Sequence, residues 1–173
     1  TGNRVDFSFG GSITLANQIT KLGAPADGVL FAGDVPGQII TEAGLELGAR
    51  APQTITNQLV VIAKEGSPPI NSLSDLTNTN RLIAVADADL APAGRYAERA
   101  LESAGLTSAN ADQLIFTLDV RAALAAVESG NAEFGIVYRT DALTSDNVVT
   151  VLEIDDGDVG YFSSGLTGAN NSR

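Results

Sequence analysis

Small and hydroxyl-bearing residues stand at three points where an expected strand gives way to an expected helix. The junctions are Gly10-Gly11-Ser12, Pro92-Ala93-Gly94 and Asp119-Val120-Arg121. The first N–H groups of a helix have no partner inside the helix, and with the helix dipole they attract anions. Small side chains let a ligand approach this backbone, and Ser12 adds a hydroxyl. The three junctions therefore favour an anion site.

Each of these residues also has a plainer interpretation. Ser12 and Asp119 are typical helix N-caps, Pro92 is typical of the first turn of a helix, and Arg121 is typical of a surface or salt-bridge residue. Tyr138 ends the apolar run FGIVY, where it is either a half-buried core residue or a phenolic donor. Pattern alone therefore leads to an α/β protein with an anion site at its helix starts.

The residue types that are absent exclude several kinds of chemistry. The chain has no Cys and no His, so it has no disulfide, no thiolate, no imidazole base and no Ser-His-Asp triad. Asp87 and Asp89 lie near the second helix start and are the acid–base pair that an enzyme would use, but solvated loop acids fit them better. We expect no catalysis and no cofactor.

The charge and hydropathy of the chain limit its partners further. A net charge of −11 argues against nucleic acid and anionic membranes, because both are bound by clustered Lys and Arg. It still permits anion binding at a small site lined by neutral N–H and O–H dipoles. The hydrophobic fraction of 44% and a mean hydropathy of +0.12 predict a soluble globular protein. The absence of Met and of a signal peptide indicates a processed or truncated chain.

Short β-branched runs alternate with Ala-rich stretches along the chain, which predicts α/β layers and a mostly parallel sheet. Helices are expected at 12–22, 36–47, 72–77, 92–104 and 120–129. Strands are expected at 5–9, 29–32, 58–63, 81–86, 114–118, 134–138 and 148–154. The Gly- and Ser-rich tail at 155–173 is expected to be irregular, apart from a short strand near Tyr161 and Phe162.

Taken together, the motifs resemble the substrate-binding component of molybdate ABC transporters. The resemblance covers about residues 3–154. It lies in FSFGGSITLANQI, GAPAD, NQLVVIAK, APAGRYAERALESAGL, DVRAALAAVESGNAEFGIVYRTDAL and VVTVL. PAGRYA and DVRAAL…GIVYRTDA, in this order and spacing, carry most of its specificity.

The resemblance implies the type II fold of periplasmic binding proteins, in which two α/β lobes with mostly parallel sheets are joined by a hinge. The chain would be truncated at both ends, with an incomplete first lobe. We expect a partial first lobe at 1–57, a second lobe at 58–152, and a return segment with a polar tail at 153–173.

The resemblance also implies a ligand set. Ser12 would give its hydroxyl and N–H, Ala93 and Val120 their backbone N–H groups, and Tyr138 its phenolic O–H. A fully ionised tetrahedral oxyanion offers only acceptors, so a site made only of donors suits it. Arg121 would lie behind the site or on the surface. Molybdenum would be bound as the oxyanion, with no metal coordinated directly by the protein.

A transport role follows from the same resemblance. The protein would be a monomer, periplasmic or extracytoplasmic and membrane-associated, and it would deliver molybdate or tungstate to an ABC transporter permease without contacting nucleic acid. Molybdate, tungstate and sulfate are not separated by the sequence. The alternative is a cytoplasmic oxyanion-sensing regulatory domain of the same fold.

Overall fold

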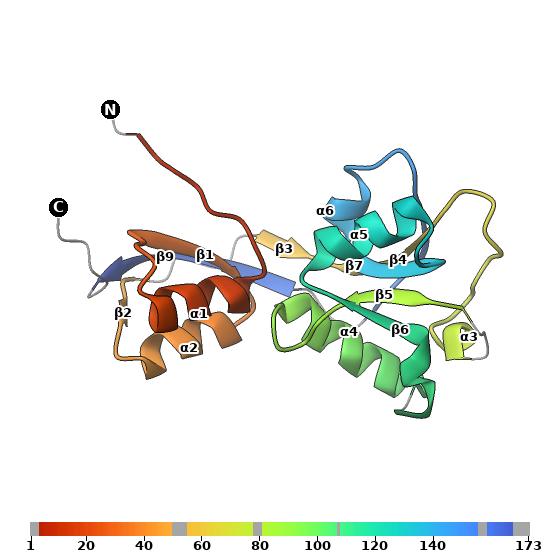
Figure 1. Ribbon diagram of the computed structural model, residues 1–173, viewed down its shortest axis with the longest axis horizontal. Coiled ribbons are helices and arrows are strands. Elements are labelled where there is room, and N and C mark those ends of the chain that lie inside the picture. The colour runs from red at the N-terminus through yellow and green to blue at the C-terminus, as the bar shows by residue number, and fades with distance from the viewer. Residues whose placement is uncertain (1–3, 50–54, 78–80, 107, 156–158, 168–173) are drawn as a thin grey trace.

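The computed structural model describes residues 4–49, 55–77, 81–106, 108–155 and 159–167. They form two α/β lobes side by side, each built on its own sheet (Figure 1). The first lobe contains α1 (Ser12–Leu22), β1 (Gly28–Ala32), α2 (Val35–Glu42), β2 (Glu46–Leu47), β3 (Ile55–Asn57) and β9 (Val159–Thr167).

The second lobe lies between β3 and β9 in the sequence. Its strands are β4 (Leu59–Ala63), β5 (Ile83–Ala86), β6 (Leu114–Thr117), β7 (Phe134–Tyr138) and β8 (Val149–Glu153). Its helices are α3 (Ser74–Thr77), α4 (Pro92–Ser103), the 3₁₀ helix η1 (Ser108–Gln113), α5 (Val120–Ser129) and α6 (Arg139–Ala142). No helix in the described part of the chain is both long and apolar enough to cross a membrane.

Each sheet contains one strand that runs against the others. In the first sheet β1, β2 and β3 all pair antiparallel with β9, so these three strands share one direction. The second sheet has the order β6-β5-β7-β4-β8. Its β5 pairs parallel with β6 and β7, whereas β4 pairs antiparallel with β7 and β8. The α/β layers are therefore confirmed. The strands of each sheet share one direction except β9 and β4, and the parallel pairings among the described strands are those of β5 with β6 and β7.

The chain passes between the lobes at two places. It leaves the first sheet at Asn57 and enters the second at Leu59, and it returns between Glu153 and Val159. The reversed strands β4 and β9 are the ones that follow these two crossings. The crossings are held together by the Ile154 N–H, which donates to the Leu59 carbonyl oxygen at 3.0 Å.

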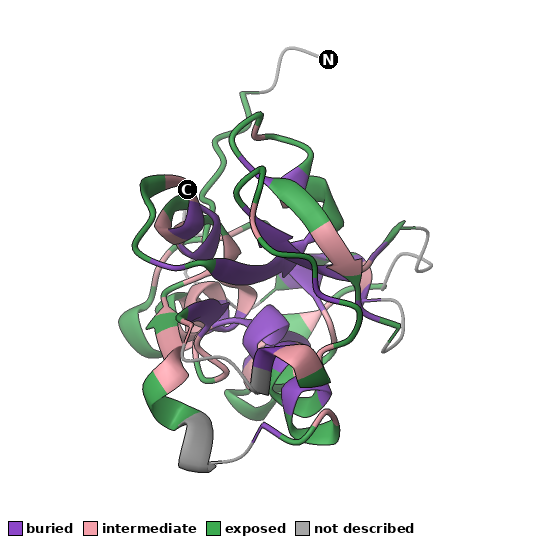
Figure 2. Cartoon of the chain, turned by 90° about the vertical axis from the view of Figure 1, so that its right-hand side faces the viewer, coloured by how far each residue is buried: buried purple, intermediate pink, exposed green. Residues whose placement is uncertain are grey.

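Helices cover both faces of the second sheet. Alternate residues of β4 and β7 point to opposite sides: Val61 and Ile136 pack with α4, and Val60 and Val137 pack with α5. All residues of β4, β5 and β7 are buried, which explains their continuous apolar sequences. The buried strands form the centre of this lobe (Figure 2).

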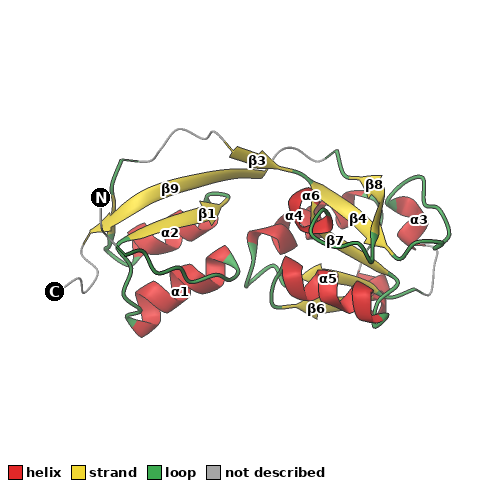
Figure 3. Ribbon diagram, turned by 90° about the horizontal axis from the view of Figure 1, so that it is seen from above, coloured by secondary structure: helices red, strands yellow, loops and turns green. Residues whose placement is uncertain are grey.

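In the first lobe the helices lie on one side of the sheet. Phe31 of β1 and Phe162 of β9 pack edge to face, with ring centroids 6.0 Å apart, against Ala16 of α1 and Ile40 of α2. On the opposite side Leu30 is 58% exposed. Figure 3 shows α1 and α2 together on the same side of β1 and β9.

Most predicted elements are confirmed, and three have the predicted bounds: α1, α5 and β7. Asp119 caps α5 by accepting a hydrogen bond from the Ala122 N–H, and Gly130 ends that helix with a φ of 81°. The helix expected to continue to Leu47 stops at Glu42 instead. Gly44 takes a φ of 80°, which turns the chain into β2.

Two predictions about the ends of the described chain are wrong. Residues 5–9 form no strand, because no described strand pairs with them, and Phe9 is 90% exposed. The tail is not irregular over Val159–Thr167, because the short strand expected near Tyr161 and Phe162 is confirmed and extends over all of these residues as β9, which pairs with β1, β2 and β3. Pairing supplies the stability that a chain rich in Gly and Ser does not provide by itself.

Candidate functional site

The second sheet brings three of the predicted ligand positions to one edge. β6, β5 and β7 are neighbours and run parallel, so their carboxyl ends lie at the same edge. Ala93 follows β5 in the first turn of α4, Val120 follows β6 as the first residue of α5, and Tyr138 is the last residue of β7. Ligands of α/β proteins bind at such edges.

The start of α4 is pressed against the end of β5. A Cβ on Gly94 would lie 2.3 Å from the Ala86 carbonyl oxygen and 2.6 Å from the Ala88 nitrogen, so only glycine fits there. Pro92 has no N–H, and the hydrogen bonds found among the described residues include none donated by the Ala93 N–H. Ala93 itself is 3% exposed. The helix start therefore holds a buried donor in a fixed position.

The start of α5 is fixed by the Asp119 side chain. Its Oδ1 accepts from the Ala122 N–H at 2.9 Å, and the Thr117 hydroxyl donates to the Asp119 carbonyl oxygen at 2.9 Å. Thr117 also donates to the Val85 carbonyl oxygen, which ties this junction to β5. The cap uses the Ala122 N–H and leaves the Val120 N–H at the front of the helix.

Ser12, the fourth predicted ligand residue, is the first residue of α1 in the first lobe. Gly11 is the N-cap of α1 and makes no side-chain cap, so the cap interpretation of Ser12 is wrong. The Ser12 hydroxyl instead accepts from the Ala32 N–H at 3.2 Å. An oxygen that accepts at a lone pair keeps its own proton, so Ser12 can still donate.

The start of α1 lies against the loop before α4. The Thr14 N–H and hydroxyl both donate to the Leu90 carbonyl oxygen, at 3.1 and 3.2 Å. A Cβ on Gly11 would lie 2.7 Å from the same oxygen. Tyr96 of α4 also reaches the first lobe: its hydroxyl lies beside Gly33, which follows β1, and would be 3.1 Å from a Cβ placed there. The lobes are therefore closed upon one another.

Tyr138 has a buried hydroxyl without a partner among the described residues. Burial raises the pKa of Tyr138 well above its ordinary value, and Tyr161, Tyr96 and Asp141 raise it further. The phenol is therefore protonated and available as a donor. Leaving such a group unpaired inside a protein costs about 1–3 kcal/mol, so its O–H is a candidate donor to a ligand.

Arg121 points away from these donors. Its Nη1 donates to the Thr144 hydroxyl at 2.8 Å, and its Nε lies 3.6 Å from Asp141 Oδ1. Burial raises the pKa of the Asp141 carboxyl, and the nearby Arg121 guanidinium opposes that rise. Arg121 thus offsets the negative charge of Asp141, whereas the predicted ligand residues Ser12, Ala93, Val120 and Tyr138 are neutral.

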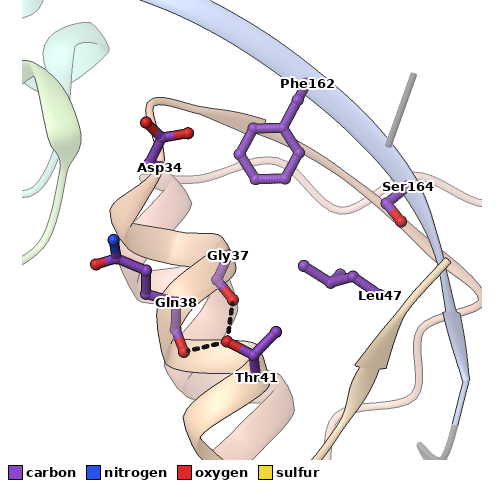
Figure 4. A pocket seen from close by; sticks show the side chains of 7 residues that line it. All are labelled: Asp34, Gly37, Gln38, Thr41, Leu47, Phe162 and Ser164. Carbon is purple, nitrogen blue, oxygen red and sulfur yellow. Dashed lines mark hydrogen bonds between the residues drawn. The ribbon is translucent and has the colours of Figure 1, made fainter. Parts of the chain in front are cut away.

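A hollow of about 340 Å³ in the first lobe does not coincide with these residues (Figure 4). It is lined by Asp34, Gly37, Gln38, Thr41, Leu47, Phe162 and Ser164. The Thr41 hydroxyl donates to the Gly37 and Gln38 carbonyl oxygens, and Ser164 donates to the Gly48 carbonyl oxygen. Because its hydroxyl protons are engaged and the Asp34 carboxylate repels anions, this hollow does not suit an oxyanion.

The acidic pair considered for catalysis has a structural role. Asp87 Oδ1 accepts from the Asp89 N–H at 2.8 Å and closes a turn before α4. The described residues also contain no group of three or more acidic side chains that could hold a metal ion. The Asp87 carboxylate thus stabilises a turn.

Sequence reasoning missed the polar residues around Tyr138. Beside it, the Asn57 Nδ2 donates to the Thr140 hydroxyl and to the Tyr161 hydroxyl. Asn57 is 9% exposed and stands two residues before the apolar run of β4. Its burial, which the sequence does not reveal, identifies this cluster, since buried polar groups are kept where they find partners.

Comparison with known proteins agrees with this geometry. Residues 1–172 match the family model of bacterial extracellular solute-binding proteins. The molybdate-binding protein ModA of Haemophilus influenzae is 39% identical over 156 residues, which is 86% of this chain and 60% of that relative. The chain therefore spans about 60% of the length of this curated relative.

Solved structures share the fold. The substrate-binding domain of a putative molybdenum ABC transporter from Clostridium difficile superposes with a TM-score of 0.66 at 31% identity, covering 97% of this chain and 74% of that one. The periplasmic molybdate-binding protein of Azotobacter vinelandii gives 0.77 at 19% identity, covering 99% and 77%. The second likeness concerns the fold alone. Both confirm the two-lobed fold expected from the sequence.

Proposed function

This chain belongs to the family of bacterial extracellular solute-binding proteins, and from that premise we propose that it binds molybdate or tungstate between its two lobes. The observation that carries the proposal is the buried Tyr138 hydroxyl, which has no partner among the described residues and lies at the sheet edge where α4 and α5 begin. The similarity to a molybdate-binding relative at 39% identity supports the choice of anion.

The four proposed ligand residues are Ser12, Ala93, Val120 and Tyr138. Each offers an N–H or O–H, and none carries a charge. A fully ionised tetrahedral oxyanion has only acceptors, so all of its contacts are satisfied by such a set. A protonated anion has an O–H group that needs an acceptor. The proposed site offers only donors, so this O–H would be left unpaired and the protonated anion would bind more weakly.

The net charge of −11 does not oppose this proposal. Helix N-termini attract negative charge at short range, whereas exposed charges farther away are screened within about 8 Å at physiological salt. Because burial raises the pKa of Tyr138, its hydroxyl stays protonated through the neutral range. We therefore expect anion affinity to stay constant between about pH 7 and pH 9, within the range where Tyr is normally protonated.

We further propose that the whole protein delivers the anion to an ABC transporter permease. The family is extracellular, which supports a periplasmic or membrane-associated location outside the cytoplasm, and we propose that it acts as a monomer. The closed arrangement of the lobes supports this role, because a permease can distinguish a closed binding protein from an open one by shape. Light scattering measures the molar mass of the protein in solution, with and without anion, and so tests whether it is a monomer.

Titration calorimetry of this chain with molybdate, tungstate and sulfate tests the proposal. We expect binding heat with molybdate and tungstate. Tyr138→Phe should weaken binding by about 1–3 kcal/mol, because a hydrogen bond to a charged acceptor is lost. Ser129→Ala is the control, since it removes a hydroxyl that donates to Ala125 at the far end of α5. Heat with sulfate alone would contradict the proposed anion, and unchanged affinity in Tyr138→Phe would remove Tyr138 from the site.

A further inference from the structure

Asn57 occupies the first crossing between the lobes. It is the last residue of β3, where it pairs with Val159 of β9, and β4 begins two residues later. Its side chain is one of the two buried polar side chains found in the described part of the chain. A buried amide costs free energy unless it is hydrogen-bonded, so its partners show what it does.

The Asn57 side chain is bonded in three directions. Its Nδ2 donates to the Thr140 hydroxyl at 2.8 Å and to the Tyr161 hydroxyl at 3.3 Å, and its Oδ1 accepts from the Gln58 N–H at 3.0 Å. Thr140 belongs to α6 of the second lobe, whereas Tyr161 belongs to β9 of the first. One amide group thus connects the two lobes at their crossing.

Both partners of Asn57 are neighbours of Tyr138. Thr140 lies two residues after it, in the helix that begins where β7 ends. The Tyr161 ring lies beside the Tyr138 ring, with centroids 6.1 Å apart and planes tilted by 58°. Because Asn57 donates to the Tyr161 hydroxyl, it holds the ring that packs beside Tyr138. The Tyr138 hydroxyl itself has no partner among the described residues.

We propose that Asn57 is a positioning residue for the anion site: through Thr140 and Tyr161 it fixes the Tyr138 ring and keeps its hydroxyl unpaired until an anion binds. This inference rests on the proposed function. The positioning role of Asn57 would make the affinity for the anion depend on the geometry of the first crossing between the lobes, and not only on the helix starts. A closing movement of the lobes would act on the site through this amide, since the amide holds one group in each lobe.

The test compares two substitutions at Thr140. Thr140→Val keeps the shape of the side chain but removes the acceptor for Asn57 Nδ2, whereas Thr140→Ser keeps the hydroxyl. Thr20→Val is the matched control, because Thr20 makes a hydroxyl bond of 2.9 Å to Ala16 within α1. Molybdate affinity is measured by calorimetry. We expect Thr140→Val to raise Kd about three- to tenfold, the usual worth of one hydrogen bond, and Thr140→Ser to recover most of that loss.

A second readout does not need an anion. The chain has three tyrosines and no Trp, and all three tyrosines, at 96, 138 and 161, interact electrostatically around this site. The near-ultraviolet circular dichroism of the tyrosines therefore reports on this cluster. We expect it to change in Thr140→Val and to return to the native spectrum in Thr140→Ser.

The outcomes separate this inference from the proposed function. If the native chain binds none of the three oxyanions, the proposed function fails, and the tyrosine spectrum still decides whether Asn57 positions the ring. If the native chain binds and Thr140→Val shows the native affinity and spectrum, the positioning role is overturned. A loss of affinity with a changed spectrum, both recovered in Thr140→Ser and absent from Thr20→Val, supports it.

Discussion

The two lobes contribute to the site in different ways. The second lobe has helices on both faces of its sheet and presents Ala93, Val120 and Tyr138 along one edge. The first lobe has α1 and α2 on one face and contributes Ser12 at a helix start. Three of the four proposed donors thus lie along one sheet edge within a single lobe, whereas the fourth depends on how the first lobe packs against the second.

Truncation of a large core side chain should reveal this difference most strongly. Phe134→Ala in β7 should lower the free energy of unfolding by about 3–5 kcal/mol, because Phe134 is fully buried between two layers. Phe162→Ala in β9 should cost no more than the lower end of that range, since Phe162 lines the hollow of the first lobe and its neighbours can relax into that space. Chemical denaturation measures both. Equal costs in the two lobes would contradict the comparison.

Glycine substitution should separate packing within a lobe from packing between lobes. In Gly94→Ala the new Cβ meets backbone atoms of the same lobe, so we expect a loss of about 1–3 kcal/mol in stability and weaker anion binding. Gly165→Ala is the control, because a Cβ there meets nothing within 4 Å. A Gly94→Ala protein of native stability would show that the start of α4 is not held rigidly.

Gly11→Ala is the complementary test at the lobe boundary. Its Cβ would meet the Leu90 carbonyl oxygen across the interface, and the lobes can separate to relieve the contact. We expect the Kd for the anion to rise about tenfold, equivalent to about 1.4 kcal/mol, with a smaller change in stability than in Gly94→Ala. Calorimetry and denaturation together check this. A loss of stability without a loss of affinity would mean that closure at Gly11 is not needed for binding.

The smallest effect is expected on the uncovered face of the first sheet. Leu30→Ser should change stability by no more than about 0.5 kcal/mol, because Leu30 is 58% exposed. Thermal unfolding measures it. A cost above about 1 kcal/mol would show that this face is covered in solution.

The accuracy of the sequence predictions depends on how regular the local pattern is. β7 and α5 in the second lobe and α1 in the first have the predicted bounds, because β7 is an unbroken apolar strand and both helices end at a glycine with positive φ. β9 was expected only as a short strand near Tyr161 and Phe162, because its burial alternates and its exposed side carries Ser163 and Gly165, which are typical of loops. The run from Val5 to Phe9 alternates as a strand does, but no described strand pairs with it.

The predicted site depended on two kinds of information. The helix starts at Ser12, Ala93 and Val120 were visible from small and capping residues, and Tyr138 from its place at the end of an apolar run. The ligand roles of all four followed from the family resemblance. The four ligand assignments are still predictions. The Asn57 cluster could not be found from the sequence, because Asn57, Thr140 and Tyr161 lie on three elements separated by 83 and 104 residues along the chain from Asn57.

The placement of β9 determines the order in which the protein can fold. Among the described residues, β1, β2 and β3 pair with β9 and not with each other. Leu30 of β1, for example, has its strand partner in Ser163 of β9, so β1 cannot be paired until β9 is present. During synthesis the second lobe has emerged before β9 exists, and domains generally fold as they emerge. The first sheet is thus assembled last, through contacts of long sequence separation, which form slowly. A ribosome-stalled chain that ends before Val159 should hold a folded second lobe beside an unfolded first one.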